Sequence, residues 1–391
     1  MATDRRLRIA LTVMFLLYGG LQLYVVAKAD AALALAWPVT AALVAWAALM
    51  TVMPLLVWRW EQRGWHRPVL IGAWLGYTWM GVAFLFFWIA LTLDLFDALL
   101  RAGGTSSGLT ARAGFLLAGA LTAAVSVYGF VAATRLRIER IVLASPKLPA
   151  GDRPLRIALI SDVHLGALIG ARRLRAIIKK LRELDADVLL SAGDLVDGQA
   201  DRLNGLAPML AALQPRLGKF AVTGNHEYFV GLERALAFHE RAGFRMLRGT
   251  AVDITEYVTL AGVDDPTGAS LELPASTDEH ALLQRCDRNR FIILIKHQPR
   301  LDIESKHPTT GWCDLQLSGH VHRGQIFPFG LLVRLSYPVA TGLTRIAGGG
   351  WLYVSRGTGT WGPPMRVMAA PEITLIELRS ESTSTDRLVA P

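Results

Sequence analysis

Five short polar clusters in the second half of the chain contain residues that could do chemistry. They are Asp162-Val163-His164, Gly193-Asp194-Leu195-Val196-Asp197, Gly224-Asn225-His226-Glu227, Ile295-Lys296-His297 and Gly319-His320-Val321-His322. Each cluster follows an apolar run typical of a β-strand, and open α/β sheets place their ligand sites on the loops at strand ends. Carboxylate, amide and imidazole groups without a thiol favour hydrolytic divalent metals such as Mn, Zn or Fe over a structural zinc cage. The clusters therefore predict a metal centre at a sheet edge.

The segments between the clusters predict the elements that must position them. Strands and helices are expected to alternate at 155–161, 171–184, 188–192, 203–213, 219–223 and 231–242. Such alternation predicts right-handed crossovers and a largely parallel sheet. Beyond about residue 250 short strands dominate, at 251–254, 258–262, 291–295, 315–317, 351–355 and 373–378. We expect a second sheet packed on the first, which gives an α/β sandwich of four layers with two β-sheets flanked by helices.

The N-terminal third of the chain has a different character. The whole chain is 52% hydrophobic with a mean hydropathy of +0.35, and the excess comes before residue 135. A bilayer core of about 30 Å needs about 20 apolar residues per helix. Runs of suitable length lie at 9–26, 31–57, 69–93 and 113–133. Buried helices of a soluble domain are disfavoured by this length and by the lack of internal charge, so we expect an all-α bundle of four transmembrane helices.

These observations predict four regions along the chain. We expect a transmembrane region at 1–134, a linker at 135–154, a catalytic domain at 155–380 and a disordered tail at 381–391. The proline content of the 135–154 stretch is what suggests a linker there.

The arginines of the short loops predict the orientation of the helices, because positively charged loops stay on the cytoplasmic side. They are Arg5, Arg6 and Arg8 before the first run, Arg59, Arg63 and Arg67 between the second and third, and Arg135, Arg137 and Arg140 after the fourth. We therefore expect a multi-pass integral protein of the bacterial inner (plasma) membrane with its catalytic domain in the cytoplasm. Much of the net charge of +9 is this arginine, so the lipid bilayer is the expected partner and a nucleic acid is not.

The order and content of the five clusters resemble the calcineurin-like metallophosphoesterase superfamily, whose pattern runs D-x-H, G-D-x-x-D, G-N-H-[DE], H, G-H-x-H. The stretches 318–325 and 352–359 are most similar to the bacterial membrane-associated branch that includes YkuE and YaeI. The resemblance covers about residues 150–380, whereas the membrane region is interpreted from hydropathy alone. Arg323 stands where a glycine is expected in this branch.

The resemblance implies two divalent metal ions. It implies that one is held by Asp162, His164, Asp194 and His322, and the other by Asp194, Asn225, His297 and His320. Asp194 would bridge, and two ions about 3.5 to 4 Å apart need such an anion between them. The resemblance also implies that His226 protonates the departing oxygen or stabilises the charge that develops on it, and that Asp197 orients its imidazole and keeps it protonated. For Glu227, a supporting role at a helix start and a direct role both remain open.

The function that these expectations describe is that of a membrane-anchored, phosphodiesterase-like hydrolase. The resemblance implies hydrolysis of a phosphate ester or pyrophosphate bond by in-line attack of a metal-bound hydroxide. Attachment to the membrane favours a lipid-linked phosphate as substrate, because anchoring raises the local concentration of such a molecule. Two alternatives remain: the same chemistry on a soluble nucleotide, and a metal-binding membrane sensor without catalysis. The presence of His226 and of every ligand residue disfavours the sensor.

Overall fold

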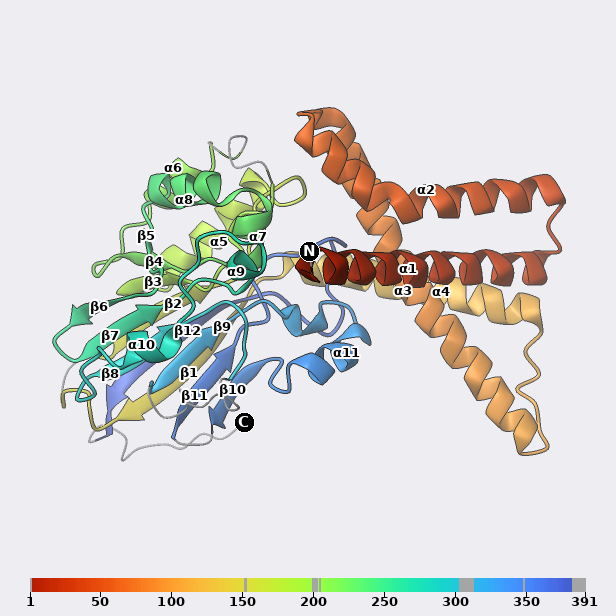
Figure 1. Cartoon of the computed structure of the whole chain (residues 1–391). Helices are drawn as coiled ribbons and strands as arrows, with labels where there is room; N and C mark the ends of the chain where they lie inside the picture. Colours follow the sequence, from red (N-terminus) through yellow and green to blue (C-terminus); the bar gives the residue numbers. More distant parts are fainter. Residues whose placement is uncertain are drawn as a thin grey trace. The chain divides into compact units, whose positions relative to one another are not determined.

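The structure is a computed structural model that describes residues 2–150, 153–198, 203, 205–301, 313–346 and 349–381. The chain divides into two units (Figure 1). The helical unit comprises residues 1–133 and 362–367, and the catalytic unit comprises residues 134–361 and 368–391.

Four long helices form most of the helical unit. They are α1 (Ala2–Leu33), α2 (Trp37–Gln62), α3 (His66–Ala102) and α4 (Ala111–Thr134). Each contains a stretch long and apolar enough to cross a membrane, as the sequence predicts. Large apolar side chains such as Leu17, Ile71 and Leu99 are about seven-tenths exposed on these helices (71%, 67% and 72%). Helices that expose such side chains are suited to lipid rather than water, and the chain is accordingly a membrane protein.

Small residues allow close packing inside the helical unit. A Cβ atom added to Gly76 on α3 would lie 2.4 Å from the Cγ atom of Met53 on α2. The segment 362–367 is far from the helices in sequence but belongs to the same unit. There the backbone N–H of Arg366 donates to the carbonyl oxygen of Gly129 on α4 at 3.0 Å. Glycines at helix contacts let backbones approach closely, as is common among membrane helices.

The first sheet of the catalytic unit has the strand order β1-β12-β2-β3-β4-β5. The bounds are β1 (Arg137–Ser145), β12 (Glu372–Ser380), β2 (Leu155–Ile160), β3 (Val188–Ser191), β4 (Lys219–Ala221) and β5 (Arg245–Met246). Strands β2 to β5 are parallel to one another. Strand β12 runs antiparallel to β2 and parallel to β1. The sheet is therefore largely parallel, as the alternation of strands and helices predicts.

The second sheet has the strand order β10-β11-β9-β8-β7-β6. The bounds are β6 (Thr250–Thr255), β7 (Val258–Gly262), β8 (Phe291–Ile295), β9 (Leu315–Ser318), β10 (Gly342–Ile346) and β11 (Gly350–Val354). The inner strands β7, β8, β9 and β11 are parallel, and β6 and β10 pair antiparallel at the two edges.

Three buried clusters hold the layers together. Residues such as Leu190 of β3 and Ile293 of β8 form the core between the two sheets. A second cluster joins the outer face of the first sheet to α5 (Ala171–Glu183), α6 (Ala207–Ala211) and α8 (Leu232–Arg241). A third places α10 (Glu279–Leu283) on the outer face of the second sheet. The order of helices, sheet, sheet and helix confirms the expected four-layer sandwich (Figure 1).

Two strands lie where the sequence did not place them. Residues 137–145, inside the expected linker, form β1 and pair with β12 from Arg137↔Glu372 to Ser145↔Ser380. Their alternation of buried Ile141 and Leu143 with exposed Val142 is the period-two pattern of a strand with one buried face. Residues 373–378, expected in the second sheet, instead lie within β12 of the first sheet. Residues 382–391 of the expected tail are outside the described residues.

Candidate active site

The five polar clusters meet at the carboxyl ends of strands from both sheets. Asp162 follows β2, Asp194 follows β3, and Asn225 begins the short helix α7 (Asn225–Phe229) after β4. His297 follows β8 and His320 follows β9 in the second sheet. Because parallel strands end at the same sheet edge, segments far apart in sequence come together there. The structure brings all the predicted ligand residues, and also His226 and Asp197, into one site.

One group of ligand atoms belongs to Asp162, His164 and His322, which lie within 4.8 Å of one another and are buried. The Nε2 atoms of His164 and His322 are 3.1 Å apart. The same Nε2 atom of His322 is 3.4 Å from Oδ1 of Asp162. Two imidazole nitrogens and a carboxylate oxygen directed at one point are a donor set that a divalent cation fits.

A second group consists of Asp194, His297 and His320. The Nε2 atom of His297 lies 3.1 Å from Oδ2 of Asp194 and 3.2 Å from Nδ1 of His320. The same Nδ1 atom lies 3.0 Å from Oδ1 of Asn225. His297 donates its Nδ1–H to the carbonyl oxygen of Ala192 at 2.7 Å, so in the neutral ring the lone pair is on Nε2. This group also fits a divalent cation.

Asp194 belongs to the second group and also faces the first. Its Oδ2 atom is 3.1 Å from Nε2 of His297 and 3.9 Å from Nε2 of His164. Burial disfavours the ionised carboxyl group, but the neighbouring imidazoles of His297, His226 and His164 outweigh burial and hold the pKa of Asp194 well below its usual range. A shared carboxylate in this position is what a pair of adjacent cations requires.

His226 forms a hydrogen-bonded pair with Asp197, whose Oδ1 atom lies 2.6 Å from Nδ1 of the ring. Burial of the imidazole favours its neutral form. The charges of Asp197 and Asp194 outweigh this effect and raise the pKa of His226 to about 9. The ring is therefore protonated at neutral pH, and Nε2 is the atom left to act on another molecule.

Glu227 resolves the alternative that the sequence left open. Its buried carboxylate accepts hydrogen bonds from the backbone N–H groups of Gly224 at 2.7 Å, Asp194 at 3.0 Å and Leu195 at 2.9 Å. A fourth donor, the N–H of Val196, lies at 3.4 Å. Glu227 therefore fixes the loop that carries Asp194, and it is not in the groups of converging ligand atoms.

Two glycines of the clusters are required by close contacts. A Cβ atom on Gly224 would lie 2.1 Å from Oδ1 of Asp194. A Cβ atom on Gly319 would lie 1.8 Å from Oγ of Ser161 and 2.4 Å from Oδ2 of Asp162. Any side chain at either position would displace a carboxylate of the site.

Aromatic residues that the sequence reasoning missed also contact the site. The rings of Trp361 and Phe229 lie 5.8 Å and 5.5 Å from the ring of His226. The ring of Tyr337 lies 5.5 Å from that of His320. No local pattern marks Trp361 or Tyr337, because both reach the site through tertiary contacts from segments outside the five clusters.

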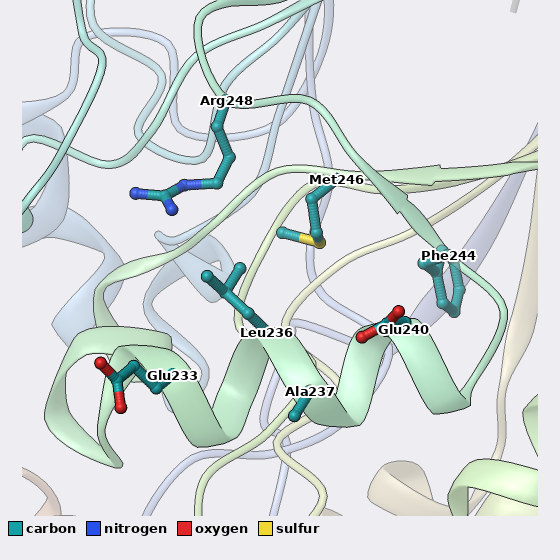
Figure 2. Close-up of a pocket in the computed structure, with 7 residues that line it drawn as sticks. All are labelled: Glu233, Leu236, Ala237, Glu240, Phe244, Met246 and Arg248. Carbon is teal, nitrogen blue, oxygen red and sulfur yellow. The ribbon is translucent and has the colours of Figure 1, made fainter.

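A hollow elsewhere on the catalytic unit does not contain this chemistry. It has a volume of about 510 Å³ and lies over α8 and β5, between side chains that include Glu233, Glu240, Met246 and Arg248 (Figure 2). None of the predicted site residues lines it. The Nε atom of Arg248 instead donates to Oδ1 of Asp264 at 2.9 Å, so the arginine is already held by a carboxylate.

Comparison with known proteins supports this chemistry. The family model for the calcineurin-like phosphoesterases matches residues 155–324. An uncharacterized metallophosphoesterase of Aquifex aeolicus is 40% identical over 247 residues, which cover 63% of this chain and 93% of that protein. A transmembrane protein with a metallophosphoesterase domain from Danio rerio is 35% identical over 273 residues, covering 68% of this chain and 62% of that protein. The metallophosphoesterase YkuE of Bacillus subtilis is 30% identical over 286 residues, which cover 68% of this chain and 94% of that protein.

The matched region begins with β2 and ends just after His322, so it contains every predicted ligand residue. The similarity to YkuE confirms the branch that the stretches 318–325 and 352–359 resemble. Converging carboxylates and imidazoles are the groups that such enzymes need. The chain belongs to the calcineurin-like metallophosphoesterase family, and it is a phosphoric ester hydrolase.

Proposed function

We propose that the chain is a membrane-anchored phosphoesterase that uses two divalent ions to hydrolyse a phosphate ester or pyrophosphate bond. One ion would be held by Asp162, His164, Asp194 and His322, and the other by Asp194, Asn225, His297 and His320. Two groups of converging donor atoms support this assignment, and Asp194 of the second group faces His164 of the first. Mn, Zn and Fe all suit these donors.

The observation that carries the proposal is the pairing of His226 with Asp197 beside the Asp194 carboxylate. When bound, the two ions would acidify a water molecule and offset the charge of the phosphate. The Nε2–H group of His226 then donates its proton to the departing oxygen. Asp197 holds Nδ1 and keeps the ring charged, while the backbone N–H of His226 donates to Oδ1 of Asp194 at 2.9 Å and fixes the ring beside the ligands.

The proposed substrate is a lipid-linked phosphate in the bacterial inner membrane, attacked from the cytoplasmic side. Four helices long enough to span a bilayer support membrane attachment. The arginine-rich loops at Arg59, Arg63 and Arg67, and after the fourth helix, support a cytoplasmic catalytic unit.

The test is hydrolysis of bis-p-nitrophenyl phosphate by the full chain in detergent, with Mn added or removed by a chelator. We expect metal-dependent turnover that Asp194→Asn abolishes together with metal binding. His226→Ala should keep the metal. It should lose about 10²- to 10⁴-fold in rate on an ester with an alkyl leaving group and much less on the nitrophenyl ester, since only the alkyl oxygen needs a proton. His280→Ala on α10 is the matched control. A wild-type protein that binds metal but does not hydrolyse the ester would refute the proposal.

A further inference from the structure

The helix α11 (Phe329–Ser336) has an apolar face turned away from the protein. Leu331, Leu332 and Leu335 are 55%, 50% and 82% exposed, and none of the helix residues is buried. The spacing of these leucines at i, i+1 and i+4 places them on one side of the helix. On the other side Val333 and the following Tyr337 pack against a buried cluster of the second sheet. The helix therefore has one face attached to the domain and one apolar face exposed.

The position of α11 is fixed to the active site. The ring of Tyr337, at its C-terminal end, lies 5.5 Å from that of His320, and its hydroxyl donates to Oε1 of Gln298 at 3.1 Å. Near its N-terminal end, a Cβ atom on Gly324 would lie 2.3 Å from the Cα atom of Gly330. Gly324 ends the short helix η2 (His322–Gly324), which begins with a predicted metal ligand. Figure 1 shows α11 beyond the strand ends and not over a sheet face.

Three aromatic side chains near the start of α11 or next to the site are also exposed. Trp361 is 54% exposed and contacts the ring of His226. Its backbone N–H and carbonyl groups are both hydrogen-bonded to the side chain of Gln325, at 3.0 and 2.7 Å. Phe327 and Phe329 are 48% and 47% exposed. We name as the apolar rim the residues Phe327, Phe329, Leu331, Leu332, Leu335 and Trp361.

The segment of chain that carries the apolar rim is positively charged. Between Asp314 and Glu372 the sequence contains five arginines and no aspartate or glutamate. Three of the arginines, Arg323, Arg334 and Arg345, are exposed. Leucine and aromatic side chains flanked by arginines, without acidic residues, are the composition of protein surfaces that lie on anionic lipid.

We propose that the apolar rim docks on the anionic surface of the membrane into which the chain's own helices insert. The chain is attached to that membrane, and residues 362–367, which directly follow Trp361, belong to the helical unit. Docking would place the His226 side of the site at the level of the headgroup phosphates. The docking proposal does not depend on the proposed function. Its consequence, that the substrate is a lipid phosphate, does rest on the proposed function.

The test places an environment-sensitive fluorophore at Leu335→Cys in a Cys286→Ser background, since Cys313 is buried. The full chain is reconstituted in bilayers of phosphatidylcholine and phosphatidylglycerol at 3:1 that contain a lipid nitroxide quencher. The matched control is Glu256→Cys, an exposed position just before β7. Strand β7 is parallel to β8, which leads to His297 at its other end, so Glu256 lies at the end of the sheet away from the site. Leu331→Cys is a second labelled position, and hydrolysis of bis-p-nitrophenyl phosphate checks that each labelled protein is folded.

We expect the lipid nitroxide to quench the label at Leu335 at least about twice as strongly as the label at Glu256. The reason is that the apolar faces of interfacial helices lie about 5 to 10 Å into the headgroup and acyl boundary. Equal quenching at the two positions would overturn the proposal. Protection of Leu335 from both lipid and aqueous quenchers would also overturn it, since a protein surface would then cover the rim. If the protein hydrolyses the soluble ester but the rim is not docked, only the docking proposal is refuted. If the wild-type protein does not hydrolyse the ester, the proposed function is refuted.

Discussion

Glu227→Gln tests how the loop that carries Asp194 is held. The carboxylate is fully buried and accepts four backbone N–H groups, two on each oxygen. Glutamine has one carbonyl oxygen and one NH₂ group. Whichever way the amide is turned, two backbone donors face the NH₂ group and lose their acceptor.

The expected loss of stability follows from these bonds. Hydrogen bonds to a charged group contribute about 1.5 to 3 kcal/mol each. One of the four, from Val196 at 3.4 Å, is long, so an amide that turns its NH₂ group toward Val196 and Leu195 loses the least. We therefore expect a cost of about 3 kcal/mol. At about 2 to 4 °C per kcal/mol for a unit of about 150 to 250 residues, the melting temperature should fall by about 6 to 12 °C.

The assay heats the full chain in detergent to a series of temperatures. The unfolded fraction is measured from the remaining hydrolysis of bis-p-nitrophenyl phosphate, which reports on the catalytic unit. The matched control is Glu233→Gln, the same change at an exposed position on α8, which should cost less than about 0.5 kcal/mol. Metal affinity should also fall about 10- to 100-fold in Glu227→Gln, because substituting a residue that holds metal ligands in place usually weakens binding by that factor. If Glu227→Gln and Glu233→Gln have the same melting temperature, the four hydrogen bonds do not hold this loop and the reasoning is refuted.

Three further predictions follow from the site and its surroundings. Asp197→Asn removes the charge that contributes most to the raised pKa of His226, about 9, so the alkaline limb of the pH–rate profile should move to lower pH for an ester with an alkyl leaving group; an unchanged limb with that ester would exclude His226 as the acid. Gly224→Ala places a Cβ atom 2.1 Å from Oδ1 of Asp194 and should reduce turnover about 10²-fold with loss of metal, measured by elemental analysis. Arg356→Met leaves the buried carboxylate of Glu372 without its cation. It should lower the free energy of unfolding by about 3 to 5 kcal/mol, measured by thermal or chemical unfolding.

The sandwich could be predicted from the sequence because its inner strands have a strong local signal. Runs such as Leu155–Ile160 and Phe291–Ile295 are buried along almost their whole length, and continuous apolar runs are typical of parallel strands covered on both faces. The helices between them bury one face only, as the basic helix α5 does with Leu174, Ile177 and Leu181. Local composition and periodicity therefore determined these elements.

The position of β1 was not predictable in the same way. Arg137 and Arg140 follow the last membrane helix, so their charges were interpreted as topology signals and not as the exposed face of a strand. The partner of β1 is β12, more than two hundred residues later in the chain. A strand at a sheet edge with only one buried face has a weak pattern of its own, and pairing over such a distance leaves no local mark.

The same distinction separates the parts of the site. Metal ligands must be carboxylate, amide or imidazole, so the sequence restricts them to a few residue types at strand ends. The supporting residues have no such restriction: Tyr337 and Trp361 touch the histidines with rings that many other side chains could replace. The face of α11 was missed for a related reason. Its leucines form a short apolar stretch in the sequence, and only the structure shows that they are exposed.

The backbone of the site shows why its clusters are so specific in sequence. Asp162, His164, Asp194, His320 and His322 all have positive φ angles, between 48° and 73°. This left-handed conformation costs about 1 to 2 kcal/mol for each residue with a Cβ atom, and glycine would remove the cost. Glycine has no ligand atom, however, so these positions keep the strained side chain and the cost is met by neighbouring bonds. Asp162 shows the compensation: its carboxylate accepts the backbone N–H of His320 at 2.9 Å. The strain and the hydrogen bonds that offset it thus lie in the same loops, and the predicted ligands are held in place by the fold itself.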